Sequence, residues 1–77
     1  MITAAQCRSA RTLLTWTVSK LASAASVSDS DIDDFELERR HLPAATLDAI
    51  QRAFQDIGVR FLANDDVRLG EDAPLIR

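Results

Sequence analysis

Three hydroxyl side chains divide the first half of the chain into short helices. Thr3, Thr17 and Ser28 each stand just before a segment in which apolar residues recur at helical spacing. Such residues cap a helix, because their side-chain oxygen accepts a hydrogen bond from a free backbone N–H of the first turn. Gln6 and, more weakly, Asp31 complete the capping-box pattern three residues further on. The predicted helices span about residues 4–14, residues 18–25 and a segment from residue 29 to the loop of residues 39–43.

A fourth helix is predicted from about Ala45 to Ile57. Its apolar residues Leu47, Ile50, Phe54 and Ile57 lie on one face, and Gly58 stands where a left-handed helix stop is needed. Trp16 is large enough to fill the core between the first two helices. The buried faces of those helices are expected to consist of Cys7, Ala10 and Leu14 with Leu13 beside them, and of Val18, Leu21, Ala22 and Ala25.

Two short strands are predicted after Gly58, at 59–62 and 67–69, with turn residues between them. Val59, Phe61, Val67 and Leu69 would share one apolar face, with Arg60 and Arg68 on the other. That apolar face needs a cover. Either it packs on the first and fourth helices, or the hairpin (59–69) pairs with that of a second copy and forms a homodimer. Residues 1–69 form one domain in this interpretation, and residues 70–77 form a flexible tail.

Composition argues against several function classes. The 77 residues carry a formal net charge of −3, whereas nonspecific nucleic-acid binders are usually basic. No apolar run approaches the length of a membrane span, and no signal peptide is recognised, so we expect a cytoplasmic protein.

Catalysis and metal binding are not expected either. Cys7 is the one cysteine and is expected to be a buried, inert thiol, and His41 is the one histidine. The chain has no glycine-rich phosphate loop and no Ser–His–Asp set. We therefore expect no enzyme activity, no metal site and no cofactor.

Residues 28–38 are acidic. They hold six of the twelve carboxylates of the chain and no Lys or Arg. If Ile32 and Phe35 face the core, most of the remaining side chains face away from it. Asp29 and Asp31 also fit a purely structural role, since carboxylates near a helix N-terminus interact favourably with its dipole. We call the following residues the outer face: Asp29, Ser30, Asp33, Asp34 and Leu37.

A set of residues accompanies the order helix, helix, tight turn, helix and fourth helix. They are 4–11 (Ala-Ala-Gln-Cys-Arg-Ser-Ala-Arg), Leu14, Thr15, Trp16, Leu21, Ala22, Ala24, Ala25, Val27, Ser28, Ile32, Phe35, Glu36, 46–50, Gly58 and Val59. In this order and these residues the chain resembles the Cro/cI-like (XRE) helix-turn-helix family over about residues 2–69. The resemblance implies an all-α, lambda-repressor-like domain of four to five helices with a short C-terminal hairpin. It implies that Arg11 pairs with Glu36, and that Ser26 and Glu38 occupy positions that often carry glycine and need positive φ.

In this family the third helix reads DNA, and here its charge opposes that function. A carboxylate about 4 Å from a phosphate is repelled by roughly 4 kcal/mol before salt screening. Two or three such contacts rival the roughly 4–10 kcal/mol that separates specific from nonspecific binding. Leu37, exposed among acids, is instead typical of a small protein-docking surface.

Two functions remain. The first is a transcriptional regulatory protein whose outer face binds another protein, such as a transcriptional activator. It resembles the helix-turn-helix-derived antiactivators of mobile genetic elements that silence quorum-sensing activators. The alternative is a dimeric XRE-family repressor that binds a palindromic operator. It would place Asp29, Ser30 and Asp34 at bases and Arg8, Lys20, Arg39 and Arg40 at phosphates.

Overall fold

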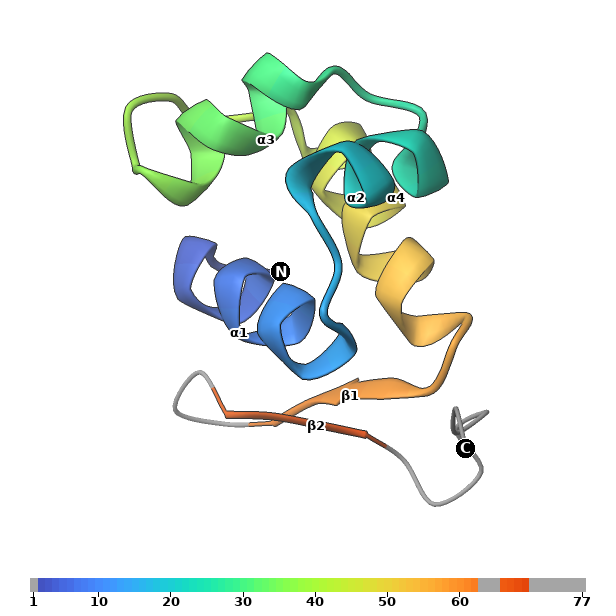
Figure 1. Cartoon of the computed structure of the whole chain (residues 1–77). Coiled ribbons are helices and arrows are strands. Elements are labelled where there is room, and N and C mark those ends of the chain that lie inside the picture. The colour runs from blue at the N-terminus through green and yellow to red at the C-terminus, as the bar shows by residue number, and fades with distance from the viewer. Residues whose placement is uncertain (1, 63–65, 70–77) are drawn as a thin grey trace.

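The protein is described by a computed structural model that covers residues 2–62 and 66–69. This part of the chain forms a small, mostly helical domain with an antiparallel hairpin, and α3 and the hairpin lie at its opposite ends with α1 between them (Figure 1). Residues 63–65 of the predicted turn and the predicted tail lie outside the described residues. The elements are α1 (Ala4–Leu14), α2 (Val18–Ala25), α3 (Asp29–Glu36), α4 (Ala44–Gln55), β1 (Val59–Phe61) and β2 (Val67–Leu69).

All three predicted N-caps are present. Thr3 and Gln6 form a reciprocal capping box at α1, with hydrogen bonds of 3.1 and 3.0 Å between each side chain and the other residue's backbone N–H. Thr17 and Ser28 each accept a hydrogen bond from the third residue of their helices. These bonds satisfy backbone donors that a helix leaves free at its start, so the helix boundaries follow from local sequence.

The first three helices end in the same left-handed turn without a glycine. The residues with positive φ are Thr15 (53°), Ser26 (59°) and Glu38 (58°). In each case the residue after it donates a hydrogen bond to the carbonyl five positions earlier, at 2.8–2.9 Å, which is the Schellman motif. The positive φ expected at Ser26 and Glu38 is confirmed, and that of Thr15 was not predicted. Each of these residues is strained, because a side chain with a Cβ disfavours this region.

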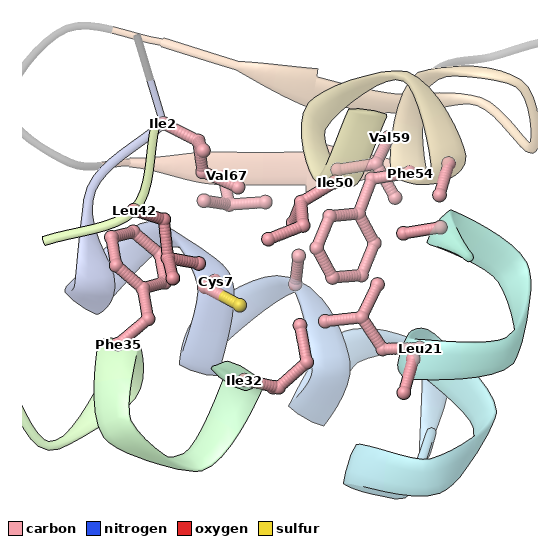
Figure 2. Packing of buried hydrophobic residues seen from close by; sticks show 14 residues of the cluster. Ile2, Cys7, Leu21, Ile32, Phe35, Leu42, Ile50, Phe54, Val59 and Val67 are labelled. Atoms are coloured by element: carbon pink, nitrogen blue, oxygen red, sulfur yellow. The ribbon is translucent and has the colours of Figure 1, made fainter. Parts of the chain in front are cut away.

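Side chains from all four helices and both strands meet in one core (Figure 2). Its largest fully buried members are Phe54, Leu21, Ile32, Ile50 and Cys7. Trp16 was expected inside this core, but it is only partly buried and stacks on Phe54 with 5.7 Å between ring centroids. Leu13 is 43% exposed, because it lies beside the buried face of α1 rather than on it.

Two predicted boundaries are wrong by a few residues. α4 ends at Gln55 instead of Ile57, and residues 56–58 form a turn in which Gly58 has φ of 95°. β1 ends at Phe61 instead of Leu62. The apolar spacing continues past the end of α4, because Ile57 still packs against the core from the turn.

The hairpin covers the core within its own chain. Val59 pairs with Leu69 and Phe61 with Val67, so the predicted register is correct. β2 packs against α1 and β1 against α4, which is the first of the two arrangements predicted for the apolar face. None of the described helices is long and apolar enough to cross a membrane.

Candidate functional site

The outer face points away from the core, as the helical spacing predicted. Ile32 and Phe35 are buried on the opposite side of α3, with 0% and 8% exposure. Four of the five outer-face residues are exposed, and Leu37 is the most exposed large apolar side chain of the described residues at 58%. Asp34 is partly buried rather than exposed.

The acids of α3 differ in how they are neutralised. Asp29 accepts a hydrogen bond from the hydroxyl of Ser19 on α2. Asp31 forms an ion pair of 2.7 Å with Arg40. Among the residues that the structure describes, the carboxylates of Asp33 and Asp34 make no ion pair and no hydrogen bond. Within the described chain, the outer face therefore carries two carboxylates that form no ion pair, beside the exposed Leu37.

The inner side of the same helix carries a fully partnered acid. Glu36 is 4% exposed, and its carboxylate forms a bidentate pair with Arg11 at 2.6 and 2.7 Å. One of its oxygens also accepts a hydrogen bond of 3.0 Å from the thiol of Cys7. The predicted Arg11–Glu36 pair is confirmed, and it ties α1 to α3.

This cluster shifts the pKa values of its members. Burial acts to raise the pKa of Glu36, but the hydrogen bonds from Arg11 and Cys7 and the nearby positive charges outweigh it, so this pKa lies below its ordinary value. The hydrogen bond to Glu36 raises the pKa of Arg11. Burial, and then the contact with Glu36, raise the pKa of the Cys7 thiol, so Cys7 is a poor nucleophile.

The bond from Cys7 to Glu36 was missed from the sequence. Burial of Cys7 was predicted and is confirmed, but no hydrogen-bond partner of its thiol was predicted. A signal was present, because Cys7 lies four residues before Arg11 and therefore on the same side of α1. Once Arg11 was paired with Glu36, Cys7 was within reach of the same carboxylate.

The four basic residues considered for DNA phosphates do not form a row of free cations. Arg8 donates to the backbone carbonyl of Glu36, and Arg40 pairs with Asp31. The ammonium of Lys20 lies 5.8 Å from the ring centroid of Trp16. Arg39 is exposed and has no ion pair within the described ranges. Such partners depend on how the elements pack together, so they were not predictable from the sequence.

A shallow groove of about 360 Å³ runs between α1 and the start of β2. Its one carboxylate, Asp66, is exposed and pairs with Arg68 at 3.2 Å, so no pair of interacting acids lines it. Among the described residues, no three His, Cys, Asp or Glu side chains come together in a way that would hold a metal ion. The groove is lined by Arg8, Ser9, Thr12, Leu13, Asp66 and Val67.

Comparison with models of known protein families and with well-characterised proteins finds no match to this chain. The geometry of α3 is therefore the main evidence on function.

Proposed function

We propose that this protein is a small helix-turn-helix regulator that acts by binding another protein through the outer face of α3. The observation that carries the proposal is Leu37, 58% exposed beside the carboxylates of Asp33 and Asp34, which form no ion pair within the described chain. An apolar centre with a polar rim is the common anatomy of a protein interface. The partner we favour is a transcriptional activator, which the protein would silence as an antiactivator.

Electrostatics favours a protein over DNA as the binding partner of the outer face. Asp33 and Asp34 would meet phosphates of the same sign, and each such contact costs about 4 kcal/mol at 4 Å before screening. Attraction elsewhere does little to offset this, since Arg8, Lys20 and Arg40 already contact groups of their own chain.

One observation keeps DNA binding as the second candidate. Only residues 26–28 separate α2 from α3, and a short turn between two helices is typical of the DNA-binding motif. A single carboxylate in the major groove is tolerated, because it accepts a hydrogen bond from a cytosine amine. The protein would then be a repressor with α3 in the groove and Arg39 at the backbone.

A titration with DNA separates the two candidates. Fluorescence anisotropy with duplexes from the promoter region of its own gene is measured at low salt, where electrostatic attraction is strongest. We expect no binding beyond that of a scrambled duplex. Tight, sequence-dependent binding under these conditions would remove the protein-docking proposal.

A second experiment identifies and tests the partner. A photo-cross-linking amino acid is placed at position 37 and, as the matched control, at position 13, where another exposed leucine lies on α1. The partner that is captured from position 37 but not from position 13 is then purified. Its affinity is measured for the double variant Leu37→Arg, Asp34→Lys and for the control variant Leu13→Arg. We expect the double variant to bind at least about tenfold more weakly, which is a loss of about 1.4 kcal/mol. Equal affinity of the two variants would show that the outer face is not the binding surface.

A further inference from the structure

The last turn of α3 leaves one backbone carbonyl to be satisfied from outside the helix. Helix ends always leave several carbonyls free, and the Schellman motif satisfies only some of them. The carbonyl of Glu36, the last residue of α3, receives none of the bonds of this turn. The bonds that close the turn run from Leu37 N to Asp33 O, from Glu38 N to Phe35 O and from Arg39 N to Asp34 O, at 3.0, 3.0 and 2.8 Å.

Arg8 of α1 satisfies this carbonyl. Its guanidinium donates a hydrogen bond to the backbone oxygen of Glu36, 28 positions away in sequence. The placement is favourable for a second reason, because a helix C-terminus carries partial negative charge. α1 therefore holds Glu36 at two points: Arg11 binds its side chain, and Arg8 binds its main chain.

The held carbonyl lies directly before the docking residue. Leu37 follows Glu36, and Glu38 then takes the left-handed conformation with φ of 58°. A non-glycine residue in that conformation is strained, so surrounding contacts must hold it there. Within the described chain, Arg8 is the one residue of another element whose side chain donates a hydrogen bond to the main chain here, at the Glu36 carbonyl directly before this turn.

We infer that Arg8 is a positioning residue for partner binding. It fixes the turn of residues 37–39 and thereby the direction in which Leu37 leaves the domain, without itself supplying the docking surface. This inference rests on the function proposed above. Arg8 then holds the turn after α3 instead of contacting a DNA phosphate, as the alternative function predicted.

The sign of one mutational effect separates this role from simple electrostatics. A partner that fits the acidic outer face is expected to be basic, so removal of the positive charge of Arg8 would by charge alone strengthen binding. Loss of the held turn would weaken it. Arg8→Gln keeps a polar side chain but removes the charge, and Arg8→Lys keeps a charged donor. Arg52→Gln is the matched control, because Arg52 is an exposed arginine of α4 whose one ion pair among the described residues is with Asp48.

The first measurement uses the free protein. Amide hydrogen exchange by NMR is followed for Leu37, Glu38 and Arg39, whose N–H groups close the turn. A charge-assisted hydrogen bond is lost in Arg8→Gln, so we expect these amides to exchange roughly tenfold faster while those of α2 stay unchanged. Arg8→Lys should lie between wild type and Arg8→Gln, and Arg52→Gln should match wild type. Unchanged exchange in Arg8→Gln would overturn the inference.

The second measurement is binding of the protein cross-linked from position 37, at a temperature well below unfolding of every variant. We expect Arg8→Gln to bind roughly tenfold more weakly, Arg8→Lys to recover most of the affinity, and Arg52→Gln to lose none. Affinity that is equal or higher in Arg8→Gln would overturn the inference. If the wild type binds no partner at all, the proposed function fails together with this role in binding, and the exchange data still show whether Arg8 holds the turn.

Discussion

Glu36 and Asp33 lie one turn apart on α3, yet their carboxylates lie in opposite environments. Glu36 faces α1, where a bidentate arginine pair and a thiol surround its carboxylate. Asp33 is exposed, and its carboxylate forms no ion pair in the described part of the chain, although its charge helps to raise the pKa of Arg11. A carboxylate on the inner side of the helix therefore links α1 to α3, whereas a carboxylate on the outer face is free to contact a partner.

One of the outer acids, Asp34, is expected to reduce stability rather than add to it. Asp34 lies three residues after Asp31, and like charges at this helical spacing repel each other. It also lies near the C-terminus of α3, where the helix dipole disfavours an anion. A charge that costs stability and forms no ion pair among the described residues is typical of a surface that serves binding. The four predictions below test this contrast between the two sides of α3.

The largest effect is expected from Glu36→Gln. It leaves the charge of Arg11 facing a neutral amide, and removal of one member of a buried pair typically costs about 3–5 kcal/mol. Because the Arg11 side chain is 22% exposed, water compensates in part, and we expect a loss of about 2–3 kcal/mol in urea denaturation. Asp48→Asn breaks an exposed pair with Arg52 and should change stability by less than about 0.5 kcal/mol. Similar losses of stability in both variants would show that the Arg11–Glu36 pair contributes no more than an exposed ion pair.

At low pH the free energy of unfolding should fall, in part because Glu36 becomes protonated. Its pKa is lowered in the fold, so the unfolded chain takes up the proton first as the pH falls. The contribution of Glu36 to stability is complete above the unfolded pKa of about 4.3 and is lost as the pH falls through the lower folded value. Urea midpoints measured from neutral pH into this range should fall more steeply for wild type than for Glu36→Gln. Parallel curves would contradict the assigned shift.

Ser26→Gly should stabilise the turn that leads into α3. Ser26 has φ of 59°, where glycine avoids a steric cost of about 1 kcal/mol. We expect a gain of about 0.5–1 kcal/mol in thermal or urea unfolding. Ser23→Gly is the matched control, because Ser23 is exposed inside α2 and glycine there should lower stability by about 0.5 kcal/mol. Changes of the same sign at both positions would show that the turn is not strained.

The smallest effect is expected on the outer face. Asp34→Asn removes the repulsion from Asp31 and the unfavourable interaction with the helix C-terminus, so stability should rise by about 0.2–0.5 kcal/mol at low salt. The gain should shrink as salt screens the charges. A clear loss of stability would mean that Asp34 has a structural partner, and the outer face would then be less free than we propose.

Local features of the fold were predictable because their causes are local. The caps at Thr3, Thr17 and Ser28 fixed the helix starts, and alternation in the hairpin fixed its register. The end of α4 was misplaced because Ile57 keeps the helical spacing while it lies in a turn.

Contacts between elements were harder to predict. The pair of Arg11 with Glu36 was expected only through a family resemblance, and the residues that join it were not expected at all. Arg8 and Cys7 reach Glu36 because α1 and α3 pack at one particular angle, which no spacing within either helix specifies. The direction of the outer face was predictable from Ile32 and Phe35, whereas its free or neutralised charges depended on these tertiary contacts.

The burial of Cys7 gives the protein a built-in reporter of its own opening. It is the one cysteine in the chain, it is 0% exposed, and its thiol resists ionisation in the fold. A chromogenic thiol reagent therefore reacts only with molecules in which the core around Cys7 has opened. The labelling rate would report the free energy of that opening in the wild-type chain, with no engineered probe.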